Sequence, residues 1–438
     1  MILRNFLNFI SVFTENTIKK IRNIYLKSNF YEKNISRIYY EELLYKPSPY
    51  LLSSLINYQT QKINVNEISA ENLWENQKIN NVNFKRLNNF YWFFSLDLKS
   101  SKKNTQKIIS SWVKKNFKFD SKSWEFDLTS KRIIAWLSSH NLTIEESGKD
   151  YQDQFNMMIQ KQTNHLINEI NSSKNLDSRM IGCAAIILVG LCYRDEKNYL
   201  AYGLNLLKKI SKFTFDNKGF PKSRNIKQLV FYLKYFILIR EWFKETQIDV
   251  PEQINETIYY LGQGYAFVWQ NIKFDILMNG NNLSNNVELD YYLKRLGYKF
   301  KNTNQEFGGY AILHNKKISL VMDIGPTPVS KLSTNYQSGA LSFEICSGGK
   351  KLISNCGYYS NKNLKLIELS KSTATHNTLT IDDNSSCQYQ KIDNKSYYIN
   401  DNLKILKKNI VFEKNYWKIN ASHDGYSKKY NTTHEREI

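Results

Sequence analysis

The sequence lacks the cysteine spacings, cationic runs and long apolar runs that mark several classes of protein. Its five cysteines are an odd number and include no CxxC pair, so they indicate neither a zinc knuckle nor a redox motif and imply no disulfides. No run of five Lys or Arg residues and no zinc-finger or RNA-recognition signature occurs, which argues against nucleic acid as a partner. The longest apolar run, "IGCAAIILVGLCY" at 181–193, is too short to cross a bilayer and predicts a buried helix.

Glycine is missing from a large part of the chain. None occurs before Gly148 and few occur before Gly280, after which glycine recurs regularly. Ahead of this boundary, apolar residues repeat at i, i+3, i+4 and i+7, which predicts amphipathic helices. The segments are "TQKIISSWVKKNF" (105–117), "TSKRIIAWLSSHNL" (129–142), "QFNMMIQKQTNHLINEI" (154–170), "LAYGLNLLKKISKF" (200–213), "IKQLVFYLKYFILIREWF" (226–243) and "INETIYYLGQGYAFVW" (254–269). Successive helices of this kind stack into a bundle, a solenoid or an α/α toroid.

After this boundary the pattern changes to short alternating segments with Gly and Asn turns, which predicts an antiparallel sandwich. These segments are "GGYAILHNKKISLVMDIG" (308–325), "ALSFEICSGGKKLISNCG" (340–357) with Gly348-Gly349 at a hairpin tip, "NTLTIDDNSS" (377–386), 396–426 and "TTHEREI" (432–438). The chain stops at Ile438 inside an apparent strand. We therefore expect a C-terminally truncated sequence that lacks the last strands of its sheet.

The net charge of +21 has several explanations. A basic surface suits nucleic acid, an anionic membrane or a polyanionic substrate such as an acidic polysaccharide. Alternatively, the charge reflects a general overuse of lysine across the whole surface. The N-terminus "MILRNFLNFISVFTENTIKKIRNIYLK" has no convincing cleavage site and reads as an amphipathic basic helix, not a clear signal peptide. This helix could lie on a membrane surface, but we expect it to pack on its own domain.

Three segments carry a resemblance to a known family: "SGALSFEICSGGKKLISNCG" (338–357), "STATHNTLTID" (372–382) and "SHDGY…THER" (422–436). They resemble the C-terminal β-sandwich domain of the heparinase II/III-like polysaccharide lyases. "DNKGFPKSRNIKQLVFYL" (216–233) also resembles that family's incomplete α/α toroid. The resemblance implies an α+β multidomain fold. Its parts would be an N-terminal amphipathic helical segment at 1–60, an α/α toroid at 61–290 and an antiparallel β-sandwich at 300–438.

The family cleaves uronic-acid polysaccharides by β-elimination. A base removes the C5 proton, amide, histidine or arginine groups neutralise the carboxylate, and a Tyr or His acid protonates the leaving oxygen. In this sequence, His376 within "THNTL" stands at the family's "HN" histidine, which is a metal ligand or cleft residue in some members. Gln337 occupies the place of a catalytic-type histidine, and Asn355 that of a metal-binding Asp. Lys227 and Gln228 stand where active lyases carry a Tyr-His pair.

The remaining polar residues at matching positions define a candidate site. The resemblance implies catalytic roles for His376, His423 and Tyr426, with His376 also a possible ligand of a structural zinc or calcium ion. The substrate-binding candidates are Arg224, Asn225, Gln337, Glu344, Asn377, His434 and Arg436. Arg224 could neutralise a carboxylate through a bidentate contact. The alternatives are purely structural: a helix cap at Arg224-Asn225, a turn at 423–426, and a solvated strand face bearing His434 and Arg436.

The resemblance therefore predicts a polysaccharide lyase that acts on an acidic glycan. The alternative is a catalytically impaired protein on the same fold that binds glycan or assists polysaccharide assembly, which Gln337 and the missing Tyr-His pair favour. Neither hypothesis needs nucleic acid or a transmembrane segment. The family's setting implies the cell envelope or periplasm.

Overall fold

A computed structural model of the 438-residue chain describes residues 17–18, 20–37, 43–56, 73–74, 81–96, 101–193, 198–284, 286–359, 363–391 and 397–438. Much of the predicted N-terminal segment 1–60, including residues 1–16, lies outside this description. The chain packs as two compact units, one of Met1–Leu207 with Glu241–Asp249 and one of Lys208–Arg240 with Val250–Ile438. The domain boundaries drawn from the sequence stay predictions.

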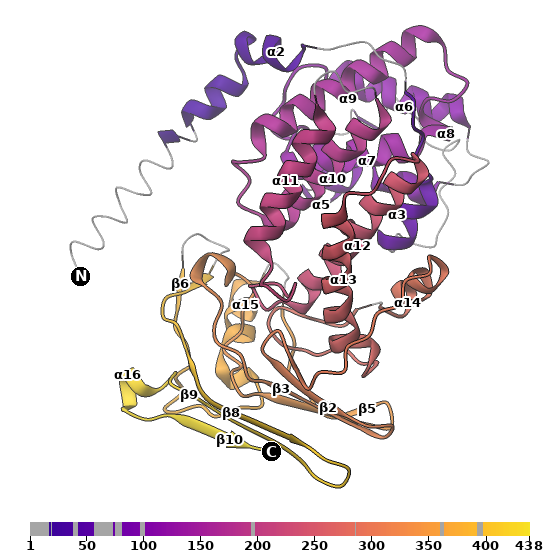
Figure 1. Ribbon diagram of the computed structural model, residues 1–438. Helices are drawn as coiled ribbons and strands as arrows, with labels where there is room; N and C mark the ends of the chain where they lie inside the picture. The colour runs from indigo at the N-terminus through magenta and orange to yellow at the C-terminus, as the bar shows by residue number, and fades with distance from the viewer. Residues whose placement is uncertain are drawn as a thin grey trace. The chain divides into compact units, whose positions relative to one another are not determined.

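The first unit is helical, and its helices carry the purple and magenta colours of Figure 1. They are α2 (Asn29–Ile35), α3 (Pro49–Ile56), α5 (Asn81–Asn88), α6 (Lys102–Lys115), α7 (Phe126–Ser138), α8 (His140–Thr143), α9 (Lys149–Glu169), α10 (Leu176–Cys192) and the first part of α11 (Tyr199–Thr214). The apolar run at 181–193 forms the buried α10, as its length and composition predicted. The buried rings of Trp112 in α6 and Trp136 in α7 pack edge to face, with their centroids 5.5 Å apart, in the core of this unit.

The second unit begins with helices. It holds most of α12 (Ile226–Glu245), then α13 (Glu252–Tyr265), a π-helical turn at Ala266–Gln270, and α14 (Asn286–Arg295). These segments match the helices predicted at 226–243 and 254–269. The prediction of helices followed by strands is therefore confirmed.

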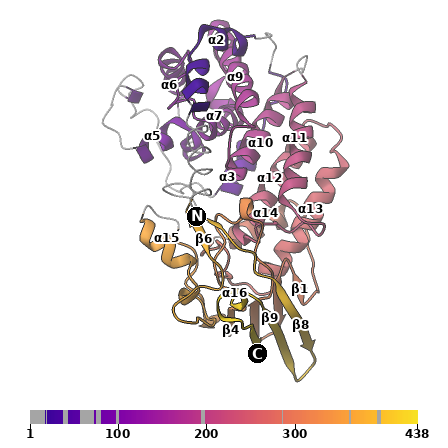
Figure 2. The same cartoon turned by 90° about the vertical axis from the view of Figure 1, so that its left-hand side faces the viewer.

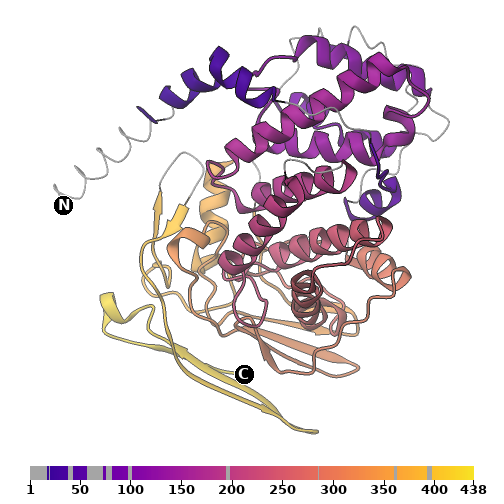
Figure 3. The same cartoon turned by 45° about the horizontal axis from the view of Figure 1, so that its top comes forward.

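Antiparallel sheets form the rest of the second unit. One sheet has the order β1-β2-β3-β4-β5, built from Glu306–Phe307, Tyr310–His314, Ile318–Asp323, Phe343–Ser347 and Lys350–Ile353. A second has the order β10-β9-β8, built from His434–Glu437, Trp417–His423 and Ile405–Phe412, and a third pairs β6 (Tyr389–Lys391) with β7 (Tyr397–Ile399). Figures 2 and 3 show β8 and β9 as a yellow hairpin.

Two of these sheets share one core. Leu313, Leu320 and Met322 of the first sheet pack with Ile419 and Ala421 of β9. The alternation of apolar residues in each strand places them on one face, so the two inward faces make the sandwich that the sequence predicted.

The prediction of a strand at "NTLTIDDNSS" is wrong. The chain forms α15 (Leu364–Lys371) and a 3-10 turn at Thr373–Thr375, and then an irregular segment with one bridge between Ile381 and Asn384. Hydroxyl side chains bond to nearby backbone here, as when Thr375 donates to the Leu369 carbonyl at 3.1 Å. Such local bonds compete with a strand ladder, which explains why a strand-like composition gives a loop.

Candidate functional site

Arg224 lies in the turn that precedes α12. Its backbone is left-handed, with a φ of 61°. The next residue, Asn225, accepts a hydrogen bond from the backbone N–H of Gln228 at 3.2 Å. Asn225 thus caps α12, as the structural alternative for this position predicted. The capped turn directs the Arg224 side chain toward the sandwich.

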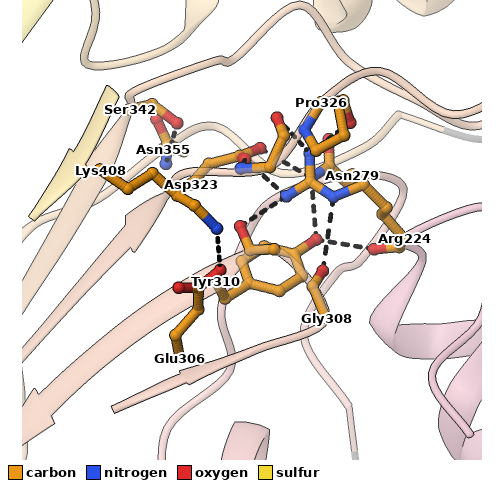
Figure 4. Close-up of polar contacts among 12 residues, drawn as sticks. Arg224, Asn279, Glu306, Gly308, Tyr310, Asp323, Pro326, Ser342, Asn355 and Lys408 are labelled. Atoms are coloured by element: carbon orange, nitrogen blue, oxygen red, sulfur yellow. Dashed lines mark hydrogen bonds and ion pairs between the residues drawn. The ribbon is translucent and has the colours of Figure 1, made fainter. Parts of the chain in front are cut away.

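The guanidinium of Arg224 is buried within the second unit (Figure 4). It forms an ion pair with Asp323 at 2.5 Å. It also donates to the backbone carbonyls of Gly309 at 2.8 Å, Gly325 at 3.0 Å, Pro326 at 3.1 Å and Gly308 at 3.4 Å. These acceptors use all five N–H groups of the side chain. Contact with a substrate carboxylate would require breaking these bonds, so the geometry gives Arg224 a structural role in place of the predicted one.

Asp323 at the end of β3 is the centre of this polar cluster. Besides Arg224, it accepts from Asn279 Nδ2 at 2.8 Å and from the Gly325 N–H at 3.2 Å. The Tyr310 hydroxyl accepts from Asn279 at 2.8 Å and donates to the Arg224 carbonyl at 2.7 Å. Burial alone would lower the pKa of Arg224, but the charge of Asp323 raises it overall, so the guanidinium stays charged.

Asp323, Tyr310 and Asn279 were not among the residues predicted from the sequence, although the sequence carries a signal for this cluster. Gly309 and Gly325 flank β2 and β3 at the points where the Arg224 side chain passes. A Cβ on Gly309 would lie 2.7 Å from Arg224 Nε, and one on Gly325 would lie 2.4 Å from Arg224 Cζ. Glycines at strand ends can thus mark a close approach by another side chain.

Gln337 is fully buried, and its side-chain amide joins three segments. Its Oε1 accepts from the Gly280 N–H at 3.1 Å, and its Nε2 donates to the carbonyls of Gly357 at 2.9 Å and Ser370 at 2.5 Å. The amide is therefore a bridge between backbone segments, and the predicted substrate contact would compete with three internal bonds.

Glu344, Asn355 and Asn377 form a chain of buried and half-buried contacts. The Glu344 carboxylate pairs with Lys351 at 2.9 Å and accepts from the Asn355 N–H at 3.0 Å. Asn355 Oδ1 in turn accepts from the Asn377 N–H at 2.9 Å. Burial raises the pKa of Glu344, while Lys351 and two backbone N–H groups oppose that rise. Glu344 and Asn377 thus hold the loop that carries His376.

His376 differs from these residues because its ring is buried but not satisfied. The side chain is 8% exposed, and among the described residues neither ring nitrogen has a hydrogen-bond partner. The Ser370 carbonyl lies near enough to favour the protonated ring, and it also accepts a hydrogen bond from Gln337 Nε2. Burial lowers the pKa of His376 to about 4, against smaller opposing effects of Asp323 and Ser370. The ring is therefore neutral at pH 7 and keeps a lone pair.

His423 and His434 form a pair on neighbouring strands. His434 Nδ1 lies 3.2 Å from His423 Nε2, and the Gly425 N–H donates to His423 Nδ1 at 3.0 Å. This geometry requires that His423 carries its proton on Nε2 and donates it to His434. Burial lowers the pKa of His423 to about 3 and that of His434 to about 4. Both rings are neutral at pH 7, and their contacts are internal.

Tyr426 and Arg436 tie the 376–379 segment to the C-terminal sheet. The Tyr426 hydroxyl donates to the Leu379 carbonyl at 2.6 Å, and burial raises the pKa of Tyr426 to about 12. Arg436 Nη1 donates to the carbonyls of Leu341, at 3.0 Å, and Asn377. His434 and Arg436 share one strand face, as their spacing predicted, and that face lies against the protein. The structure thus brings the predicted residues of the sandwich together mainly as a structural network.

The candidate metal positions do not fit a structural zinc or calcium ion. In the parts of the chain that the structure describes, no group of three or more His, Cys, Asp or Glu side chains is arranged to hold a metal. Gln337 and Asn355 present amides that already make hydrogen bonds, which leaves only the His376 ring as a ligand of the kind that zinc prefers.

None of the described helices is long and apolar enough to cross a bilayer.

Comparisons with known proteins agree on the fold. Residues 304–438 match the model of the heparinase II/III-like C-terminal domain. The structure is similar to the BT4657 gene product, a heparinase III, with a TM-score of 0.66 and 14% identity over 87% of this chain and 65% of that chain. It is also similar to a mutant of the heparan sulfate lyase HepC from Pedobacter heparinus, with a TM-score of 0.61 and 12% identity over 92% and 69% of the two chains.

A third similar structure is heparinase III, with a TM-score of 0.59 and 13% identity over 92% of this chain and 72% of that chain. A comparison with curated proteins found no match. At these identities the likeness establishes the fold, which is an incomplete α/α toroid followed by an antiparallel β-sandwich. Residues 304–438 thus match a heparinase II/III-like C-terminal domain, and the chain shares its fold with solved heparinases.

Proposed function

We propose that this protein is a polysaccharide lyase that cleaves an acidic, uronic-acid-containing glycan by β-elimination at the cell envelope. The family of its C-terminal domain and its fold support the proposal. The observation that carries it is the state of His376, a buried neutral imidazole whose ring nitrogens have no partner among the described residues. A polar ring in this state is expected to be kept for a ligand, because an unsatisfied buried polar group costs stability.

The chemistry assigns His376 the role of the base. In the elimination, the lone pair of the ring takes the C5 proton of the uronate, the C4–C5 double bond forms and the C4–O bond breaks. The leaving oxygen takes up a proton from an acid or from water. A folded-state pKa near 4 makes His376 a weak base in the free protein. A bound polyanion favours the protonated ring and would raise this pKa toward the working pH.

The charge of the chain supports an anionic substrate. A net charge of +21 attracts a polyanion over distances comparable to the Debye length, which is about 8 Å at physiological ionic strength. Heparan sulfate and heparin are the first substrates to test, because similar structures are heparinases and heparan sulfate lyases.

The test is the ultraviolet absorbance of the unsaturated uronate product. Purified protein is mixed with heparan sulfate, heparin, chondroitin sulfate, hyaluronan or alginate, with and without EDTA. We expect product from at least one glycan, no effect of EDTA, and loss of the signal in His376→Ala. His314→Ala is the matched control, because this half-buried histidine ends β2 in the same unit, away from the proposed base. Activity that survives in His376→Ala would refute the assignment of the base.

The second candidate is a glycan-binding or polysaccharide-assembly protein without lyase activity. The internal bonds of Arg224 and Gln337 favour it, because the groups expected to neutralise a carboxylate are already engaged. Glycan binding by calorimetry, with no unsaturated product from any glycan in the panel, would establish this function and exclude the lyase.

A further inference from the structure

The N-terminal helical stretch of the first unit exposes an apolar face. Ile18, Ile21 and Ile24 are 64%, 62% and 72% exposed, and Tyr25 beside them is also exposed. Residues three apart on a helix lie on one side, so these side chains form a continuous apolar stripe. Contiguous exposed apolar surface of this kind marks an interaction site more often than scattered single residues do.

The opposite side of this stretch is anchored to the unit. Leu26 is buried, and Arg22 pairs with Glu169 of α9 at 2.6 Å. Ser28 then caps α2 by accepting the Tyr31 N–H at 3.1 Å. These contacts hold Arg22 and Leu26 against the rest of the first unit and leave the three isoleucines exposed.

The apolar stripe is bordered by positive charge. Lys20 and Lys27 are exposed, and both lie at the edge of the stripe on the side away from Arg22. The sequence has no Asp or Glu between Thr17 and Tyr31. An apolar face with a cationic border and no acidic residue within the stretch is complementary to the anionic headgroups and acyl boundary of a membrane surface.

We propose that this stripe docks the protein on an anionic lipid surface, with the isoleucines in the acyl boundary and Lys20 and Lys27 at the headgroups. A partner copy of the chain would meet the same lysines with equal charge, which opposes self-association through this face. The proposal does not depend on lyase activity, and it would place the protein near envelope polysaccharides.

The test is co-sedimentation of the full chain with vesicles of phosphatidylcholine alone or mixed with phosphatidylglycerol. We expect binding to the anionic vesicles that weakens with added salt. Ile21→Asp with Ile24→Asp should weaken binding at least about tenfold, because each change removes an inserted side chain. The matched control is Leu283→Asp with Leu352→Asp, which alters residues that are 82% and 67% exposed in the second unit, and it should bind as the unaltered protein does.

A second variant tests the proposal even if the isoleucine variant misfolds. Lys20→Glu with Lys27→Glu keeps the apolar stripe and should remove the preference for anionic vesicles, while circular dichroism stays unchanged. Equal binding by the isoleucine variant and its control would overturn the proposal. So would a concentration-dependent dimer, seen by analytical ultracentrifugation, that the isoleucine variant abolishes without any change in vesicle binding.

Discussion

Replacing Arg224 with alanine tests whether this arginine stabilises the sandwich or binds substrate. In the folded chain its five N–H groups bond to Asp323 and to four backbone carbonyls around the ends of β2 and β3. The variant leaves Asp323, which is 1% exposed, with the Asn279 amide and the Gly325 N–H as the donors to its side chain among the described residues. A buried charge that loses its counter-ion is strongly destabilising because water cannot replace the lost partner.

The structure sets the size of this effect. Removing one partner of a buried ion pair costs about 3–5 kcal/mol, which is a large part of the about 5–15 kcal/mol that typically stabilises a domain. Arg224→Lys should lose less, because it keeps the charge near Asp323 but cannot reach all five acceptors. The control is Lys407→Ala. Lys407 pairs with Glu435 at 2.9 Å on an exposed strand, and its loss should cost less than about 1 kcal/mol.

Hydrogen exchange with mass spectrometry measures this change in the second unit. Peptides that cover β3 report on the sandwich separately from the helices of the first unit. At about 1.4 kcal/mol per tenfold, Arg224→Ala should lower their protection by about a hundredfold to a few thousandfold. If these peptides were as protected in Arg224→Ala as in Lys407→Ala, the structural role of Arg224 would be refuted. Arg224 would then again be a candidate for substrate binding.

Three further predictions concern the same unit. Gly325→Ala places a Cβ against the guanidinium and should destabilise β3, and it should add little in Arg224→Ala, as a double-mutant cycle would show. Tyr426→Phe removes the bond to the Leu379 carbonyl and should cost about 1 kcal/mol in urea unfolding without changing lyase activity, whereas a large loss of activity would mean a catalytic hydroxyl. Because the pKa of His434 falls from 6.5 to about 4 on folding, the unfolded chain binds its proton first as the pH falls. The stability contributed by this histidine is therefore complete above pH 6.5 and declines from there to about pH 4. As the pH falls through this range, the midpoint of urea unfolding should decrease less steeply in His434→Gln than in the unaltered protein. An equal pH dependence in both proteins would contradict the lowered pKa.

Much of the candidate site could be located from the sequence, but the contacts of its residues could not. The positions of His376, Asn377, His423 and Arg436 were marked by their resemblance to a family. In the structure Arg436 bonds to the Asn377 carbonyl beside His376, while His423 pairs with His434 on the neighbouring strand. The resemblance could not show that Arg224 would be fully engaged, because its acceptors lie more than 80 residues away along the chain. Asp323 was missed for the same reason.

The local elements and their order followed from patterns of neighbouring residues. Helical periodicity predicted α6, α7, α9 and α11–α13, the apolar run predicted α10, and the Gly348-Gly349 turn predicted the hairpin of β4 and β5, because these patterns depend on neighbouring residues. The partners of the polar groups and the conformation around His376 depend instead on contacts made in the folded chain. There, hydroxyl and amide side chains satisfy the backbone in place of a strand ladder, and packing leaves one imidazole buried with its nitrogens unpaired among the described residues. Which polar group is satisfied depends on contacts between distant segments, and those contacts exist only once the sandwich has formed.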